Sequence, residues 1–366
     1  MDLSMHSNNM KQILENFRIE GVVTEVQPLG NGLINDTYRV VTEGGPSYVL
    51  QRIYHAIFKD VELLQNNIEA VTSHIRSKLE AAGETEVDRK VLKFIPLKSD
   101  ARTWWFDGTS YWRVSEFIEN TVTVETVNPE SSYYAGRTFG NFQSMLADIP
   151  VQLGETIPDF HNMELRARQL EEAMAADAVG RASETEVQEI YAQMKEYMEE
   201  MCKAERMHRE GVLPKRVCHC DTKVNNMLFD KNGQVLCVID LDTVMPSYIF
   251  SDYGDFLRTA ANKVAEDCPE IDKVEFDMEI FEAFTKGYLE SASSFLIPVE
   301  IENLPYAAAL FPFMQAVRFF ADYINGDTYF KTKYPEHNLV RTRNQMALFR
   351  SVMAHKAEME AFIATL

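Results

Sequence analysis

The order of strand-like and helix-like patterns along the chain restricts its fold more than any other feature. Short stretches rich in β-branched and aromatic residues fill most of the first 118 residues, and glycine-containing turns separate several of them. From about residue 130 the periodicity is helical, except for one strand-rich island between Val217 and Ile239. This order predicts an α+β chain of two lobes, a small N-terminal lobe (residues 1–118) and a larger, mainly helical C-terminal lobe (residues 119–366).

The N-terminal lobe is predicted to be a five-stranded antiparallel sheet with one helix inserted after the third strand. The hairpin signal Glu43-Gly44-Gly45 joins the second and third strands, and Asp107-Gly108 joins the last two. The inserted helix follows Asp60, which is a suitable N-cap, and Gly83 is a suitable stop. Between them apolar residues recur at three- and four-residue steps, which is typical of an amphipathic helix.

Composition excludes several classes of partner. The chain has 36 basic and 56 acidic residues, a formal charge of −20, and such a surface repels nucleic-acid phosphates and anionic lipids. No stretch approaches the ~18–20 apolar residues of a membrane span, and the first twenty residues lack the pattern of a signal peptide. The five cysteines are scattered and do not form a disulfide framework. We therefore expect a cytoplasmic protein that binds neither nucleic acid nor membranes, and the sequence implies no protein partner.

The densest polar cluster lies in the strand-rich island, where residues 219–226 form a loop between two apolar strands. Asp221 and Asn226 share this loop, and a hairpin returns Asp240 to the same end. A carboxylate can accept the proton of an attacking hydroxyl, and a side-chain amide with a second carboxylate can hold Mg²⁺ against a triphosphate. A metal at Cys218-His219-Cys220 is less consistent with the sequence, because zinc sites favour ligand pairs with two residues between them and a second such pair.

This H-x-D-x-x-x-x-N pattern, followed by an apolar strand and I-D, resembles the catalytic core of the aminoglycoside phosphotransferase and choline kinase group, within the protein-kinase-like fold. Longer segments are similar to the bacterial N-acetylhexosamine 1-kinases of that group, including GNGLINDTYRV, WRVSEFIENTV and the closing RFFADYINGDTYFKTKYPEHNLVRTR. The resemblance covers nearly the whole chain. It implies ATP- and Mg²⁺-dependent phosphorylation of the anomeric hydroxyl of N-acetylglucosamine or N-acetylgalactosamine, without indicating which sugar is preferred.

The resemblance also implies roles for individual residues. Asp221 would be the catalytic base beside the sugar hydroxyl, and Lys223 would neutralise the transferred phosphoryl group. Asn226 and Asp240 would hold magnesium, with Asp242 as a helper for a second ion. The nucleotide would contact a glycine loop over the phosphates and a hinge against adenine, formed respectively by Gly30, Asn31 and Gly32 and by Glu116, Phe117 and Ile118.

The sugar is expected to contact the closing segment through Arg318 and Tyr329. Two structural alternatives stand beside these roles, an ion pair for Arg318 and packing under a loop for Tyr329. Near the catalytic loop, His219 is expected to support the backbone. Asp252 and Asp255 are expected either to brace the catalytic backbone or to cap a helix.

One position departs from the family pattern. The third strand of this fold usually carries a Lys or Arg that pairs with the phosphates and with a helix Glu. Here Gln51 stands at that position, and Arg52 should point to the opposite face because side chains alternate along a strand, unless a bulge turns it inward. Glu69 on the inserted helix would be the partner of such a cation.

Two other functions remain open from the sequence. One is a kinase of another small alcohol, such as another sugar or an amino alcohol, on the same fold. The second is a catalytically inactive nucleotide- or sugar-binding protein, which is disfavoured because the base and the metal ligands are all present. A choline-type substrate needs an acidic or aromatic cage for its cation, whereas the closing segment offers an arginine.

Overall fold

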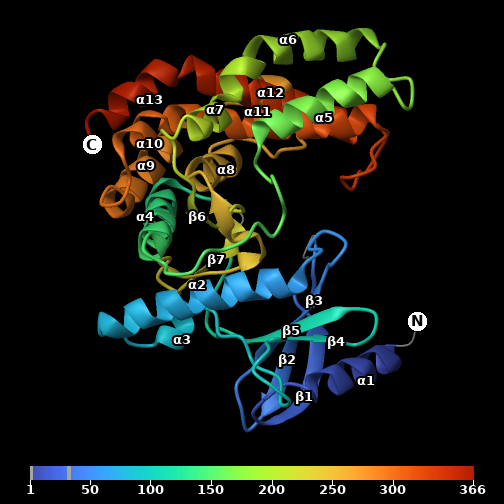
Figure 1. Cartoon of the computed structure of the whole chain (residues 1–366), viewed down its shortest axis with the longest axis vertical. Helices are drawn as coiled ribbons and strands as arrows, with labels where there is room; N and C mark the ends of the chain where they lie inside the picture. The colour runs from blue at the N-terminus through green and yellow to red at the C-terminus, as the bar shows by residue number, and fades with distance from the viewer. Residues whose placement is uncertain (1–2, 31–33, 125) are drawn as a thin grey trace. The chain divides into compact units, whose positions relative to one another are not determined.

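A computed structural model describes residues 3–30, 34–124 and 126–366, which form two compact units (Figure 1). The first, here called the sheet unit, comprises the chain up to residue 123 together with residues 148–158 and 227–245. The second, the helical unit, comprises residues 124–147, 159–226 and 246–366. The sheet unit therefore extends beyond the expected boundary at residue 118 and includes two later segments.

The sheet unit contains the predicted five-stranded antiparallel sheet, in the order β1-β2-β3-β5-β4. Its strands are β1 (Val22–Pro28), β2 (Asp36–Glu43), β3 (Tyr48–Ile53), β4 (Trp104–Phe106) and β5 (Tyr111–Glu116). The central strand β3 pairs with β2 and β5, and its register places Gln51 between Thr37 and Arg113. These three side chains therefore share one face of the sheet.

Three helices accompany the sheet, α1 (Leu3–Leu14), α2 (Val61–Ala81) and α3 (Val87–Lys90). The predicted helix α2 begins as expected, because Asp60 Oδ1 accepts the backbone N–H of Leu63 at 2.9 Å. Helix α1 was not predicted. Its residues Met10, Ile13 and Leu14 pack into the core that also contains Leu50 and Val114. The core therefore lies on the face of the sheet opposite to Gln51 and Arg113, by strand alternation.

The later segments of the sheet unit form a small hairpin and a turn. Strands β7 (Met227–Phe229) and β8 (Val235–Val238) pair with each other. The 3₁₀ turn η2 (Leu241–Thr243) follows them, directly after Asp240. Because Asp240 adopts a left-handed conformation, with φ of 59°, the chain turns sharply at the residue expected to bind metal.

The helical unit contains ten helices within its described residues: α4 (Pro129–Leu146), α5 (Met163–Ala176), α6 (Thr185–Met201), α7 (Lys203–Arg209), α8 (Phe250–Ala260), α9 (Met278–Ala292), α10 (Pro298–Glu302), α11 (Leu304–Ile324), α12 (His337–Ala354) and α13 (Lys356–Ile363). It also contains β6 (Arg216–Cys218), which pairs with β9 (Met245–Ser247), and the 3₁₀ turns η1 (Val224–Asn226) and η3 (Ile271–Lys273). Helices α6 and α7 are separated only by Cys202.

Helix α11 lies at the centre of this unit and packs against α5, α8 and α12. It is buried along nearly its whole length, because its sequence is apolar on all sides. Helices α4 and α9 approach closely at glycines: a Cβ at Gly136 would lie 2.1 Å from the Phe284 carbonyl oxygen, so only glycine fits. No helix in the described part of the chain is long and apolar enough to cross a membrane.

Candidate active site

Three of the expected site residues meet in the loop between β6 and η1 of the helical unit. Lys223 Nζ lies 3.1 Å from Asp221 Oδ2. Asn226 Nδ2 donates hydrogen bonds to the Asp221 carbonyl oxygen at 2.8 Å and to Asp221 Oδ2 at 3.0 Å. The Asp221 side chain is 27% exposed, so it remains accessible to a substrate hydroxyl while its neighbours fix its orientation.

Asp252 on α8 binds the backbone of this loop. Its buried carboxylate accepts the backbone N–H groups of His219 at 3.0 Å and Cys220 at 2.8 Å, and the side-chain amide of Gln143 at 2.8 Å. Burial raises the pKa of Asp252, and these hydrogen bonds act in the opposite direction. Asp252 therefore braces the backbone of the loop that carries Asp221, one of the two roles considered for it, and the left-handed conformation of Cys220 falls within that braced segment.

The neighbouring residues of this loop serve structure rather than metal binding. His219 Nδ1 accepts the backbone N–H of Asp221 at 3.3 Å, which confirms its expected supporting role. The thiols of Cys218 and Cys220 are buried, and burial raises the pKa of both well above the ordinary value. A thiolate is the form that binds metal, so this environment opposes metal ligation. Asp255 pairs with Arg258 at 3.0 Å and does not contact the catalytic backbone.

Arg318 on α11 is enclosed by aromatic rings. Its guanidinium carbon lies 5.5 Å from the ring centre of Phe160, 5.9 Å from that of Tyr329 and 5.4 Å from that of Phe330, within range of cation–π attraction. Nη1 donates to Gln315 Oε1 at 3.0 Å. Burial lowers the pKa of Arg318. Within the described residues no ion pair with a carboxylate is formed, so the ion-pair alternative is not what the structure shows.

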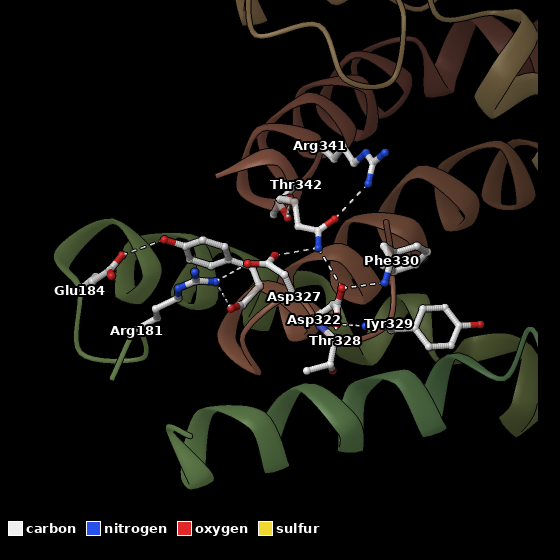
Figure 2. A network of polar contacts seen from close by, with 11 residues as sticks. Arg181, Glu184, Asp322, Asp327, Thr328, Tyr329, Phe330, Arg341 and Thr342 are labelled. Atoms are coloured by element: carbon white, nitrogen blue, oxygen red, sulfur yellow. Dashed lines mark hydrogen bonds and ion pairs between the residues drawn. The ribbon is translucent and has the colours of Figure 1, made fainter. Parts of the chain in front are cut away.

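The segment that carries Tyr329 is fixed by a buried carboxylate (Figure 2). Asp322 accepts the consecutive backbone N–H groups of Thr328, Tyr329 and Phe330 at 2.9, 2.8 and 3.0 Å, and the side-chain amide of Asn338 at 2.8 Å. Tyr329 itself is 62% exposed, and its ring extends away from this network. It is therefore not packed under the loop.

A second set of contacts holds the start of the same segment. Asp327 adopts a left-handed conformation, with φ of 59°. Its carboxylate receives hydrogen bonds from Arg181 Nη1 at 2.7 Å and Asn338 Nδ2 at 2.9 Å. Arg181 Nη1 also reaches the carbonyl oxygen of Tyr323 at 2.7 Å, and its guanidinium lies over the Tyr323 ring (Figure 2). Arg181 was not in the expected site, because it acts through backbone that only the fold brings near it.

Arg318 and the rings of Phe160, Tyr329 and Phe330 are here called the wall around Arg318. Helix α8 connects this wall with the loop that carries Asp221. Asp252 binds the loop, and the charges of Asp255 and Arg258, one turn later on α8, act on Arg318. Asp255 also acts on His161, which stacks on Phe160 with ring centres 4.3 Å apart. Burial lowers the pKa of His161 to about 3, so this ring is neutral at physiological pH. The two sets of residues therefore belong to one electrostatic neighbourhood of the helical unit.

The nucleotide residues expected in the sheet unit are partly described. Gly30 has a φ of 68°, which favours glycine, whereas Asn31 and Gly32 lie outside the described residues. In the expected hinge, the N–H groups of Glu116 and Phe117 donate to the carbonyl oxygens of Lys93 and Ser47, both at 2.9 Å. A backbone donor for adenine would therefore come from Ile118 or a later residue.

The structure shows where Arg52 and Glu69 lie relative to Gln51, the residue that departs from the family pattern on β3. Arg52 forms an ion pair with Asp36, and both side chains are about half exposed. Arg52 thus points to the face opposite Gln51, as strand alternation predicted. Glu69 on α2 does not meet a cation there; its carboxylate accepts the hydroxyl of Thr103.

A buried arginine instead lies beside Gln51. Arg113 on β5 is 2% exposed, and its Nε donates to Gln51 Oε1 at 3.0 Å. Its Nη2 lies 2.5 Å from Asp242 Oδ1, and Asn35 Nδ2 donates to Asp242 Oδ2 at 2.6 Å. Sequence reasoning did not identify Arg113, although a charged residue between Trp112 and Val114 in a strand next to the hinge was an available signal.

The expected metal ligands provide oxygen donors of the kind that Mg²⁺ prefers. Asn226 uses its amide nitrogen to bind Asp221, which leaves its amide oxygen as the atom suited to a cation. Asp240 supplies a carboxylate at the sharp turn before η2. Both residues fit magnesium by their chemistry. Asp242 would have to give up Arg113 or Asn35 in order to contribute an oxygen.

A cleft of about 700 Å³ lies beside the catalytic loop within the helical unit. Lys223, Val224 and Asn225 form one wall, and the remaining walls come from the beginning of α4, the end of α8 and the beginning of α9. Arg318 and Tyr329 are not among its lining residues. This cleft therefore borders the loop that carries Asp221 without including Arg318 or Tyr329.

Comparison with known proteins places this architecture. The sequence profile of the phosphotransferase enzyme family matches residues 25–289, most of the chain. Similar solved structures include an aminoglycoside phosphotransferase from Alicyclobacillus acidocaldarius (14% identity, 95% of each chain covered, TM-score 0.62) and amicoumacin kinase with AMP-PNP and Ca²⁺ (16%, 96% of this chain and 94% of that one, 0.61). The choline kinase of Streptococcus pneumoniae has the same fold (15%, 95% and 99%, 0.53). The chain belongs to the phosphotransferase enzyme family.

Proposed function

We infer that this protein is an ATP- and Mg²⁺-dependent kinase that phosphorylates the anomeric hydroxyl of N-acetylglucosamine or N-acetylgalactosamine. The observation that carries this proposal is the loop of residues 219–226, in which Lys223 and Asn226 converge on the Asp221 carboxylate. A loop of this composition suits phosphoryl transfer, where catalysis consists of positioning and charge stabilisation.

In the proposed reaction the sugar oxygen attacks the γ-phosphorus of ATP, and the bond from that phosphorus to the ADP oxygen breaks. Asp221 accepts the proton of the attacking hydroxyl, because its carboxylate is accessible and oriented by Asn226. Lys223, 3.1 Å from that carboxylate, is placed to neutralise the transferred group. Asn226 and Asp240 would hold magnesium, which neutralises charge on the phosphates when bound.

The wall around Arg318 supports a sugar as the acceptor. Arg318 offers donors that suit ring hydroxyls or an N-acetyl oxygen, and the exposed ring of Tyr329 can contact an apolar sugar face. A cationic substrate such as choline is disfavoured here, because the wall already contains a guanidinium. The anomeric hydroxyl is the most acidic hydroxyl of a free sugar, which suits a carboxylate base.

The test is a comparison of free sugars with their methyl glycosides. N-acetylglucosamine or N-acetylgalactosamine should yield the 1-phosphate, identified by phosphorus NMR, while the methyl glycosides should be inert even at high concentration. Formation of a 6-phosphate, or turnover of a methyl glycoside, would contradict the 1-kinase assignment and leave the kinase assignment intact.

The cleft beside Lys223 favours a second candidate, a kinase of another small alcohol. It borders the catalytic loop, and its lining includes the acidic residues Asp277 and Glu279 as well as Lys223 and Lys263. A larger or cationic alcohol would suit such mixed charge. A panel of amino alcohols and aminoglycosides, assayed for ADP release beside the N-acetylhexosamines, distinguishes the two candidates.

A further inference from the structure

Among the described residues of the sheet unit, one ion pair is fully buried, and its position is not explained by the core. Arg113 and Asp242 are 2% and 3% exposed, and their charged groups lie 2.5 Å apart. Burying a charge pair costs desolvation that the pair recovers only with good geometry and further hydrogen bonds. Arg113 lies three residues before Glu116 of the expected hinge, and Asp242 lies two residues after Asp240. Because burial of the pair is costly, these positions point to a role at the nucleotide site.

The surrounding contacts orient both members of the pair. Gln51 receives the Arg113 Nε–H at 3.0 Å and donates to Thr37 Oγ1 at 3.2 Å, so the arginine is aligned across β2, β3 and β5. Asn35 Nδ2 donates a hydrogen bond to the second carboxylate oxygen of Asp242, Oδ2, at 2.6 Å. Asp242 therefore has a hydrogen bond at Oδ2 and an ion pair with Arg113 at Oδ1, and Gln51 on β3 joins Arg113 on β5 to Thr37 on β2.

Two further contacts hold the backbone of the turn that follows Asp240. Thr156 donates to the carbonyl oxygen of Asp242 at 2.9 Å, and Asn67 Nδ2 donates to that of Val244 at 3.0 Å. These neutral contacts hold the backbone of the turn, whereas Arg113 is the residue that compensates the charge of Asp242. Without it, the charge of Asp242 would stand uncompensated two residues from the expected magnesium ligand.

We propose that Arg113 is a positioning residue for magnesium, acting from β5 in place of the cation that this fold usually carries on β3. It binds Asp242, and Asp242 in turn orients the turn that presents Asp240. This inference rests on the proposed function in that Asp240 is taken as a magnesium ligand. It further assigns Asp242 as an anchor for the turn rather than as a metal ligand, and it assigns no nucleotide role to Arg52.

The test measures Mg·ADP binding by calorimetry, with ADP in EDTA as a second readout. Arg113→Met and Asp242→Asn should each raise the Kd for Mg·ADP by about 10- to 100-fold, the usual effect of removing a residue that orients a metal ligand. The Kd for ADP in EDTA should change little. The matched control is Arg52→Met, which removes an exposed arginine of the neighbouring strand and should leave both values within about twofold, as surface ion pairs contribute little.

The double variant Arg113→Met/Asp242→Asn keeps the test decisive if a buried unpaired charge prevents a single variant from folding, because it removes both charges together. Its Kd for Mg·ADP should be no higher than that of either single variant, since coupled residues are not additive. Wild-type or tighter Mg·ADP binding by Arg113→Met, alongside weaker binding by Asp242→Asn, would make Asp242 a direct ligand and overturn the inference. A wild-type chain that does not bind Mg·ADP would instead overturn the proposed function.

Discussion

Replacing Asp322 by alanine should impair sugar binding far more than nucleotide binding, although this side chain is not expected to contact either ligand. Asp322 accepts three consecutive N–H groups of the segment that carries Tyr329, and the side-chain amide of Asn338 (Figure 2). The carboxylate is 5% exposed. Its removal therefore releases the segment that faces Arg318.

The magnitude follows from the environments of the donors. Hydrogen bonds to charged groups contribute ~1.5–3 kcal/mol each, and a buried donor left unsatisfied costs ~1–3 kcal/mol. Thr328 and Tyr329 are exposed, so their N–H groups recover hydrogen bonds to water, whereas Asn338 is fully buried and cannot. We expect Asp322→Ala to lower the free energy of unfolding by about 3 kcal/mol. Asp322→Asn should cost about half as much, because it keeps one acceptor oxygen and turns a donor toward the remaining N–H groups.

The assay combines urea unfolding with steady-state kinetics at fixed ATP and at fixed sugar. The KM for sugar should rise about tenfold, equivalent to ~1.4 kcal/mol spent on ordering the released segment, while the KM for ATP should stay within about twofold. Arg343→Ala is a suitable control, since it removes an exposed ion pair with Glu186 in the same unit and should cost at most ~1 kcal/mol. A fall in stability with an unchanged sugar KM would show that Asp322 supports the fold without positioning the sugar.

Three further predictions concern the proposed chemistry and the pH response. Asp221→Asn should lower kcat by ~10²–10⁴-fold without changing the Kd for ADP; retention of a tenth of the wild-type kcat would exclude Asp221 as the base. Asn226→Ala and Asp240→Ala should each raise the Mg²⁺ concentration needed for half-maximal activity, Asp240→Ala more, because it removes a charged ligand; unchanged magnesium titrations would reject both. His161 is held neutral by burial, with its pKa lowered to about 3, so it contributes stability above pH 6.5 that is lost as the pH falls toward 3. Between pH 6.5 and 5 the loss should be at most ~2 kcal/mol, and His161→Phe should reduce it in pH-dependent thermal unfolding; an unaltered pH profile would contradict this.

Local patterns were sufficient to predict much of the fold. The N-cap Asp60, the period of α2 and the hairpin at Glu43-Gly44-Gly45 are signals that neighbouring residues carry by themselves, and the structure has the predicted sheet and helix. Helix α1 was not predicted, although Met10, Ile13 and Leu14 follow helical spacing; in the structure these three residues pack in the core of the sheet unit. Tertiary packing of this kind leaves little trace in a single helix.

The candidate site divides in the same way. Asp221, Lys223 and Asn226 lie within six residues, so their spacing alone indicated that they act together. Arg113 and Asp242 are far apart in sequence, and no motif at either residue predicts that they form an ion pair. Gln51 showed that the usual Lys or Arg of the third strand is absent. Only the register of β3 with β5 shows that a cation lies beside it on the neighbouring strand.

Two buried carboxylates, Asp252 and Asp322, perform the same physical task in the helical unit. Each lies on a helix of the core, α8 or α11, and each accepts at least two consecutive backbone N–H groups of a loop. A carboxylate suits this task because its two oxygens offer about four acceptor positions and no donor. Helices α8 and α11 pack against each other. The loop that carries Asp221 and the segment that carries Tyr329 are therefore both fixed to the same packed pair of helices. Changes within that packed pair should therefore alter the base and the sugar wall together, whereas changes at either carboxylate should alter only one of them.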